Sequence, residues 1–265
     1  MRTSLCALAV LVALAAPAGA AESVVELPTR PGASLRMLVD VPPDPIGSVL
    51  LLAGGNGELD LEPDGRIANF YGNPPVRTRA LYLEAGFAIG VPDVASDLKS
   101  GDGPASYMRQ VSSAQLVDLG NAIRHMRAIA APVAVIGFSR GATPAAAVAG
   151  VGGPARPDAL VLVSGMWFTT RATPTSIEYV VGRDGEFAQP ALLVAHAEDA
   201  CPFSNPAELA RFRGRLGGPR VETLVLQGGG PPRGDRCGPF AFHGHVGMDR
   251  EAVAAMVEWL KALPR

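Results

Sequence analysis

The sequence lacks any concentration of charge of one sign. Its 265 residues carry 23 Lys and Arg against 25 Asp and Glu, which gives a net charge of −2. No basic or acidic run marks a polyelectrolyte partner, so we expect no nucleic-acid binding. No internal repeat is found, and 31 Gly and 24 Pro are spread without a period. That distribution excludes collagen-like and low-complexity chains and indicates many turns.

Residues that hold metals and cofactors are also scarce. The chain has four His and three Cys, and the cysteines form no C-x-x-C pair, which disfavours a zinc site. No Gly-rich stretch continues into Lys and Ser or Thr, and no G-x-G-x-x-G opens a helix. Loops that bind phosphate or dinucleotides need these patterns. The sequence therefore predicts neither a metal nor a cofactor.

Near the N-terminus, the apolar stretch from Leu5 to Ala16 follows an early arginine and precedes Pro17 and an Ala-Gly-Ala ending at Ala20. This order is typical of a secretory signal peptide. The alternative, a retained membrane anchor, would need about 20 apolar residues. We therefore expect a signal peptide at 1–20, a mature domain at 21–265 in the periplasm or medium, and no membrane anchoring after cleavage.

Two cysteines, Cys201 and Cys237, remain if the peptide leaves with Cys6. An even pair in an oxidising compartment predicts a disulfide, and two separate thiols are the alternative.

Short apolar runs predict the strands. SVVELP and SLRMLVDVP lie between Pro and Gly and predict an antiparallel pair at the start of the domain. The later runs mostly lack alternation, which is typical of strands buried on both faces of a parallel sheet. They are SVLLLA (48–53), FAIGV (87–91), VAVI (133–136), ALVLV (159–163), ALLVA (191–195) and VETLVL (221–226).

Helical periodicity lies between these runs, at 76–85, 107–130 and 249–263. Strands that alternate with helices predict a single α/β domain with a mostly parallel, twisted sheet and helices on both faces. The segment 165–189 is either a small cap over the site or a long connection. Four of its large apolar residues would form a wall near the substrate or pack in the core: Met166, Trp167, Phe168 and Phe187.

The stretch GFSRG places Ser139 between the apolar run VAVI and the small residues ATPAAAVAG. Strand, tight turn and helix are the context of a nucleophilic serine at a sharp elbow, where Gly137 and Gly141 avoid collisions with the neighbouring strand and helix. The alternative is a Gly-rich turn whose serine caps a helix. The context favours the nucleophile.

With this motif, the chain from about Ser48 onward resembles the α/β-hydrolase fold family, in particular its small exported or dienelactone-hydrolase-like esterases. The resemblance implies a triad in the order Ser, acid, His, with the acid after a late strand and the His before the last helix. Asp199, in HAEDAC after ALLVA, matches the acid, with Glu198 as the substitute. His243 and His245, in FHGHVG, match the base, and the following glycine favours His243.

An oxyanion hole would complete such a site. The backbone N–H of Arg140, the residue after the nucleophile, supplies one donor, and the loop AGGNG after the strand 48–53 supplies another. Gly55 is the first choice and Asn56 the second. Ala53 stands where many family members have a histidine.

The resulting prediction is a serine hydrolase that cleaves small to medium carboxylic esters through an acyl-enzyme. A peptidase or amidase of the same fold, and a non-catalytic exported binding protein, are the alternatives. The side chain of Arg140 would favour an anionic substituent. The oligomeric state is left open.

Overall fold

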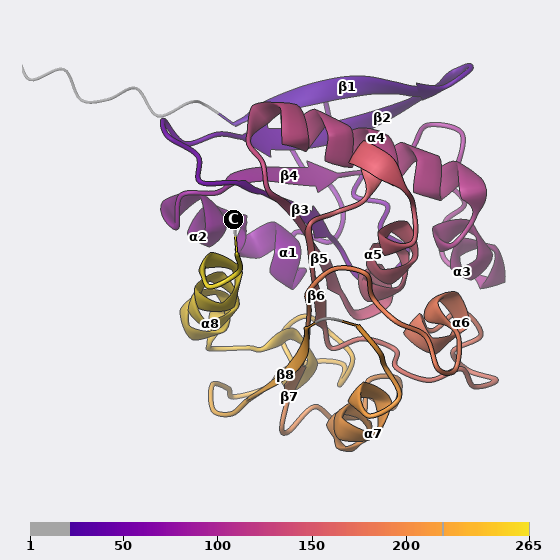
Figure 1. Ribbon diagram of the computed structural model, residues 1–265, viewed down its shortest axis with the longest axis vertical. Helices are drawn as coiled ribbons and strands as arrows, with labels where there is room; N and C mark the ends of the chain where they lie inside the picture. The colour runs from indigo at the N-terminus through magenta and orange to yellow at the C-terminus, as the bar shows by residue number, and fades with distance from the viewer. Residues whose placement is uncertain (1–21, 219, 265) are drawn as a thin grey trace, which may run out of the picture.

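Eight strands form one sheet in the order β1-β2-β4-β3-β5-β6-β7-β8 (Figure 1). The computed structural model describes residues 22–218 and 220–264, so the predicted signal peptide lies outside the described residues. β1 and β2 pair antiparallel, as do β2 and β4, and every later pairing is parallel. The strands are β1 (Ser23–Arg30), β2 (Ala33–Asp40), β3 (Ser48–Leu52), β4 (Ala88–Pro92), β5 (Val133–Phe138), β6 (Ala159–Val163), β7 (Ala191–His196) and β8 (Val221–Leu226).

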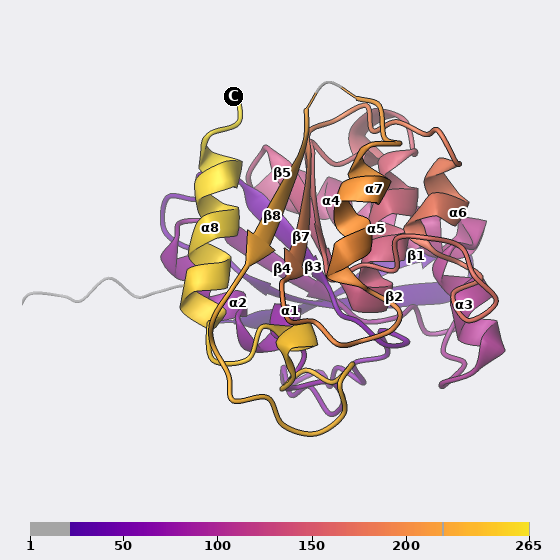
Figure 2. The same ribbon diagram turned by 90° about the horizontal axis from the view of Figure 1, so that it is seen from below.

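Both faces of the sheet are covered, which explains why the parallel strands read as continuous apolar runs. Along β3, Leu50 and Leu52 face one core cluster, while Val49 and Leu51 face another on the opposite side. Figure 2 shows α3 to α7 on one side of the sheet and α1, α2 and α8 on the other. The predicted fold class is therefore confirmed: a mostly parallel α/β sheet covered on both faces. The later helices are α5 (Ala142–Ala149), α6 (Ile177–Val181), α7 (Leu209–Arg213) and α8 (Asp249–Lys261).

Two of the expected helices are each divided in two. In place of one helix at 76–85, α1 (Pro74–Arg77) ends at Thr78 and α2 (Arg79–Glu84) begins beside it. In place of one helix at 107–130, α3 (Pro104–Gln110) is followed by α4 (Ser113–Ile129). Ser112 between them has extended backbone, and its hydroxyl accepts a hydrogen bond from the Gln115 N–H. This N-cap starts a new helix where apolar periodicity alone runs on.

Trp167, Phe168 and Phe187 of the segment 165–189 lie in the core. Trp167 packs against Phe212 of α7 at 5.6 Å between ring centres, and Phe168 meets the same ring edge-on at 5.5 Å. Phe187 belongs to the same core cluster. Ordinary packing, the alternative to an apolar wall around the substrate, therefore accounts for these three side chains.

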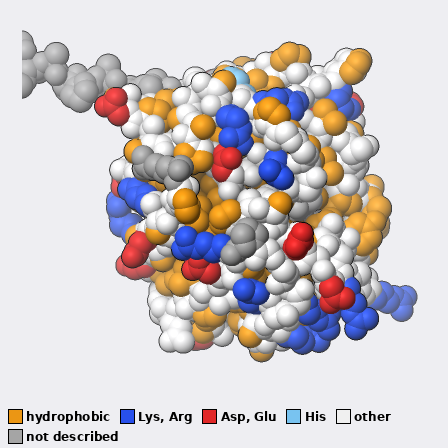
Figure 3. Space-filling view, in the orientation of Figure 1, with side chains coloured by type: hydrophobic (Ala, Val, Ile, Leu, Met, Phe, Trp, Pro, Cys, Tyr) orange, Lys and Arg blue, Asp and Glu red, His pale blue; other side chains and the backbone are white. Residues whose placement is uncertain are grey.

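On the face seen in Figure 1, basic and acidic side chains are interspersed (Figure 3). Basic groups gather only toward the corner near α6 and α7, where Arg215 pairs with Glu178 and Arg211 with Glu208. Within the described ranges, no helix combines the length and the apolar character needed to cross a bilayer.

Candidate active site

Ser139 lies on a strained turn between β5 and α5. Its backbone φ is +53°, a region that L residues other than glycine rarely adopt. A Cβ atom at Gly137 would lie 2.7 Å from the Cα atom of Ala142, and one at Gly141 would lie 2.7 Å from the carbonyl oxygen of Leu52. The turn therefore requires glycine at both positions, as the sequence indicated. Ser139 itself is only partly buried, so its hydroxyl is not enclosed in the core.

His243 connects this serine to a carboxylate. It lies in a short 3-10 turn, Phe242–Gly244, between β8 and α8. Its Nε2 atom is 2.9 Å from the hydroxyl oxygen of Ser139, and its Nδ1 atom is 2.9 Å from Oδ2 of Asp199. Three side chains that are far apart in the sequence thus form one continuous hydrogen-bonded chain at the carboxyl edge of the sheet. Glu198, the substitute for the acid, is exposed.

The carboxylate of Asp199 is held by donors from its own loop. The Cys201 N–H donates to Oδ1 at 2.8 Å, and the Ser204 hydroxyl donates to Oδ2 at 2.7 Å. The Ser204 oxygen also lies 2.9 Å from Nδ1 of His243. A carboxylate fixed in this way keeps the proton of the imidazole on Nδ1 and leaves Nε2 free to accept one. The sequence analysis did not identify Ser204, because a loop serine carries no distinguishing pattern.

His245, the other candidate base, has a different environment. Its Nε2 atom lies 3.2 Å from the Ser164 hydroxyl, which donates to the backbone carbonyl of His243 at 2.9 Å. Burial, and after it the neighbouring His196 and His243, lower the pKa of His245 to about 3. His245 is therefore neutral at ordinary pH and supports the turn that carries His243.

His196 also supports this region. It stacks on Phe242 with ring centres 4.8 Å apart, and its Nε2–H donates to the carbonyl oxygen of Gly228 at 3.0 Å.

A disulfide joins Cys201 and Cys237, as the sequence predicted. Cys201 is the residue whose N–H binds the carboxylate of Asp199. Cys237 begins the loop that leads through Phe240 to His243. The cross-link therefore connects the acid loop to the histidine loop, each within a few residues of its functional side chain.

The loop after β3 approaches Ser139 from the other side. A Cβ atom at Gly54 would lie 3.1 Å from the Cβ atom of Ser139, so this backbone passes close to the nucleophile. Gly55 has φ of +65° and lines the same cavity as Ser139. The side chain of Asn56 accepts a hydrogen bond from the Glu58 N–H at 3.0 Å. The backbone N–H groups of Gly55, Asn56 and Arg140 remain the candidate oxyanion donors.

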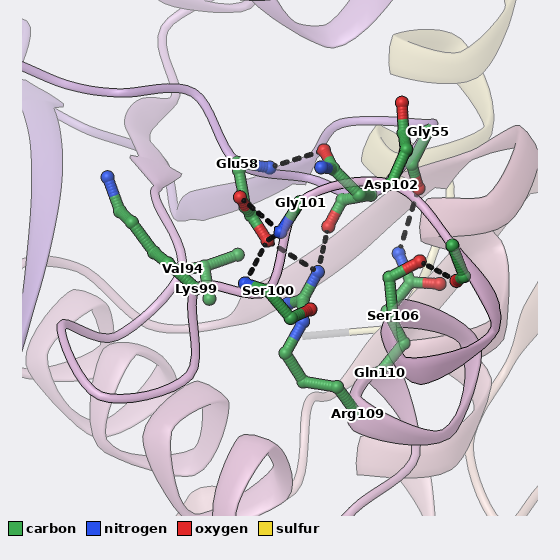
Figure 4. A network of polar contacts seen from close by, with 12 residues as sticks. Gly55, Glu58, Val94, Lys99, Ser100, Gly101, Asp102, Ser106, Arg109 and Gln110 are labelled. Carbon is green, nitrogen blue, oxygen red and sulfur yellow. Dashed lines mark hydrogen bonds and ion pairs between the residues drawn. The ribbon is translucent and has the colours of Figure 1, made fainter.

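Two side chains of α3 hold the carbonyl oxygens of this loop (Figure 4). Gln110 Nε2–H donates to the Gly55 oxygen at 2.9 Å, and the guanidinium of Arg109 donates to the Asn56 oxygen. The carboxylate of Glu58, which accepts two backbone N–H bonds from Ser100 and Gly101, lies 3.6 Å from Arg109. Because C=O and the following N–H point in opposite directions in a planar peptide, binding the Gly55 oxygen fixes the direction of the Asn56 N–H. Sequence reasoning missed this contribution of α3.

The side chain of Arg140 points away from the cavity. Its guanidinium lies 3.8 Å from the ring centre of Tyr107 and donates to the Ser106 hydroxyl at 2.7 Å. Burial lowers the pKa of this guanidinium from its usual value. These contacts give no support to the expectation that Arg140 selects an anionic substituent. Among residues 22–218 and 220–264, no group of three or more His, Cys, Asp or Glu is arranged to hold a metal ion.

Comparison with known proteins identifies the fold. No family model and no curated protein matches the sequence. The solved structure of dienelactone hydrolase from Anabaena variabilis, however, superposes with a TM-score of 0.65, covering 93% of this chain and 100% of that one at 17% identity. The chain has the α/β-hydrolase fold.

Two further solved structures with this fold are similar to the chain. An esterase of Pyrococcus furiosus matches with a TM-score of 0.59 and 17% identity, covering 91% of this chain and 92% of its own. Est1E from Butyrivibrio proteoclasticus, solved with ferulic acid bound, matches with a TM-score of 0.57 and 12% identity, covering 88% and 99%. The shared α/β-hydrolase fold places Ser139 at the end of a central parallel strand, where ligands of open α/β sheets bind.

Proposed function

We propose that this chain is a serine hydrolase that cleaves carboxylic esters. The observation that carries the proposal is the continuous chain from the Ser139 hydroxyl through His243 to Asp199, with 2.9 Å at each step. An isolated serine is a weak nucleophile, and a positioned base and a carboxylate are what activate it. The names of the structural neighbours, which include esterases and a dienelactone hydrolase, agree with this chemistry.

In the first step, the Ser139 oxygen attacks the ester carbonyl while Nε2 of His243 takes the hydroxyl proton. Asp199 stabilises the imidazolium through Nδ1–H. The imidazolium then gives its proton to the oxygen of the departing alcohol, and an acyl-Ser139 remains. In the second step, water attacks the acyl group while His243 takes a proton from it. Collapse of that intermediate releases the acid and returns the proton to Ser139.

Negative charge that develops on the carbonyl oxygen needs donors that are already in position. We assign this role to the backbone N–H groups of Gly55, Asn56 and Arg140, because Gly55 lines the same cavity as Ser139 and Arg140 is the residue after the nucleophile. Removing one such donor from a serine hydrolase costs about 100-fold to 1,000-fold in kcat. Gln110 and Arg109 act as positioning residues here, because they bind carbonyl oxygens of the loop and not the substrate.

A fluorophosphonate probe tests the proposal directly. We expect the folded wild-type protein to be labelled at Ser139 and the Ser139→Ala variant to be unlabelled. Absence of labelling in well-folded wild type would favour a non-catalytic binding protein. Turnover of short-chain nitrophenyl esters compared with matched aminoacyl anilides then separates esterase from peptidase. Faster hydrolysis of the anilides would overturn the assignment to esters.

We also propose that the protein is exported through the signal peptide expected at 1–20. The disulfide between Cys201 and Cys237 supports this, because such bonds persist mainly in oxidising compartments. N-terminal sequencing of the protein from the periplasm or medium tests it. A protein that keeps Met1 and stays in the cytoplasm would contradict the proposal.

A further inference from the structure

An open cavity of about 290 Å³ lies beside Ser139. This volume is near the lower end of small-molecule sites, which span roughly 300 to 1,000 Å³, so the cavity suits a single substituent of a substrate. Within the part of the chain that the structure describes, no charged side chain lines it. Its lining residues are mostly aromatic or glycine: Gly55, Phe70, Tyr71, Gly72, Asn73, Phe138, Ser139, Cys237, Pro239 and Phe240.

One wall depends on a strained residue. Phe70 has a backbone φ of +60°, which is exceptional for a bulky side chain. Its carbonyl accepts the Asn73 N–H at 2.8 Å, and the Asn73 side chain accepts the Gly54 N–H at 3.1 Å. A Cβ atom at Gly55 would lie 2.9 Å from Cζ of Phe70, so the ring packs directly on the oxyanion loop. Strain of this kind persists where surrounding contacts enforce it, and it concentrates at ligand sites.

A second wall is formed by Phe240, in the loop that begins at Cys237. A Cβ atom at Gly72 would lie 2.7 Å from its Cζ atom. Arg77 fixes the two walls together, because its guanidinium donates to the carbonyl oxygens of Gly72 and Pro239 at 2.7 and 2.9 Å. The same guanidinium lies 5.7 Å from the ring centre of Phe240. Partly buried polar contacts of Arg77 thus hold these walls in place.

The rim of the cavity exposes aromatic surface to solvent. Tyr71 is 73% exposed and Phe240 is 39% exposed. Large apolar side chains exposed together beside a reactive group indicate a binding surface more often than a packing fault.

We propose that this cavity binds an uncharged aromatic group of the ester, packed against Phe70, Tyr71 and Phe240. The inference rests on the proposed function. Aromatic rings favour offset-stacked or edge-to-face contacts with one another, which aliphatic groups of equal size cannot make. A carboxylate on the same group would lose water without gaining a partner. Arg140, the residue after the nucleophile, is directed to Tyr107 and Ser106, and the guanidinium of Arg77 is paired with Asp249 at 2.7 Å.

Two matched ester pairs test the proposal on wild-type protein, with acid release followed by pH-stat and each rate divided by the alkaline hydrolysis rate of that ester. In the first pair, benzyl acetate is compared with cyclohexylmethyl acetate, so the aromatic ring is on the alcohol. Ethyl phenylacetate against ethyl cyclohexylacetate places it on the acyl group. We expect kcat/KM to favour the aromatic member at least tenfold in one pair. We expect ethyl (4-carboxyphenyl)acetate to be at least tenfold slower than ethyl phenylacetate.

Variants assign the preference to the cavity. Tyr71→Ala and Phe240→Ala should reduce the aromatic preference to less than threefold, mainly by raising KM for the aromatic ester. Tyr179→Ala is the matched control, because Tyr179 is an exposed tyrosine on α6 outside the cavity. Its preference should equal that of wild type. Thermal melting checks that each variant is folded.

Two failures are distinguishable. If wild type is labelled by fluorophosphonate and cleaves all four neutral esters but shows less than a threefold aromatic preference in both pairs, the aromatic site is wrong and the serine hydrolase stands. If it is neither labelled nor active, the proposed function fails as well. A preference that survives both cavity variants also overturns the assignment to this cavity.

Discussion

The two sides of Ser139 are held in place by different means. On the triad side, a disulfide and a set of buried hydrogen bonds fix Asp199 and His243. On the oxyanion side, the loop at Gly55 and Asn56 is held by hydrogen bonds from the side chains of α3 and by the Asn73 side chain, which accepts the Gly54 N–H. The triad side moves protons and tolerates little error in distance, whereas the oxyanion side must only direct N–H groups at one point.

The comparison shows that a covalent bond and non-covalent contacts together position the groups of one site. The triad side joins loops that follow β7 and β8, and β8, whose loop carries His243, is an edge strand that pairs with β7 on one flank. The oxyanion loop follows β3, a central strand paired on both flanks by β4 and β5. A loop that leaves a central strand starts from a fixed position, so a few side-chain hydrogen bonds suffice to direct it.

The largest expected effect distinguishes the roles of His243 and His245 on the triad side. His243→Ala should lower kcat/KM for a nitrophenyl ester by at least about 1,000-fold, because triad members act as a unit. His245→Gln should remain within about tenfold of wild type, because His245 contacts Ser164 and not Ser139. Steady-state kinetics on both variants measure this. Greater loss in His245→Gln would exchange the two roles.

Breaking the covalent restraint should have the next largest effect. The double variant Cys201→Ser, Cys237→Ser should lose roughly 2 to 4 kcal/mol of unfolding free energy, the usual contribution of a disulfide. It should also lose about tenfold in kcat, since a misplacement of about 1 Å costs up to ~100-fold. Urea denaturation and kinetics measure the two losses. A variant as stable and active as wild type would show that hydrogen bonds alone hold the triad side.

On the oxyanion side, Gln110→Met removes the donor to the Gly55 oxygen while it keeps the shape of the side chain. We expect kcat to fall about tenfold with KM nearly unchanged, because the loop then directs its N–H groups less well in the transition state. Gln115→Met is the matched control. Gln115 is buried, and together with Gln110 it lines a second, small cavity that Asn56 of the oxyanion loop also borders. Equal losses in both variants would indicate a packing effect instead of positioning.

The smallest effect concerns stability against pH. The pKa of His245 is lowered to about 3 in the folded protein, whereas an unfolded histidine titrates near 6.5. The unfolded chain therefore takes up this proton first as pH falls, so stability is full above about pH 6.5 and declines toward pH 3. The slope from this group is at most about 1.4 kcal/mol per pH unit.

Urea unfolding at pH 7, 6, 5 and 4 measures that slope. His245→Gln should flatten it, and the control His125→Gln on α4 should not. An unchanged slope in His245→Gln would mean that other groups cause the acid sensitivity.

Much of the fold was predictable because it depends on local patterns. The strands were found within about two residues, since short apolar runs between turn residues mark buried strands wherever they pair. The divided helices were missed. At Ser112 and Thr78 the apolar periodicity continues through the break, and only a capping hydrogen bond or a local backbone angle ends the first helix.

The candidate site, like the fold, has features that were predictable from the sequence and features that were not. The elbow at Ser139 was predictable because glycine is required on both sides of a strained turn. The support from Ser204 and Gln110 was not, because a single polar side chain at a loop or helix end carries no pattern until its partner is known. An apolar wall from the segment 165–189 was one of two expectations, whereas the aromatic residues that line the cavity are Phe70, Tyr71, Phe138 and Phe240.

By itself, the sequence determined an α/β sheet buried on both faces, a serine on a glycine-flanked turn and a pair of cysteines available for a disulfide. Those features follow from periodicity, steric limits and residue chemistry, which act over a few neighbouring positions. Only the tertiary structure decided which histidine meets the serine, which side chains hold the oxyanion loop and which aromatic residues surround the cavity. Each of those outcomes depends on distances between segments far apart in the chain, and such distances are fixed by the packing of the whole sheet.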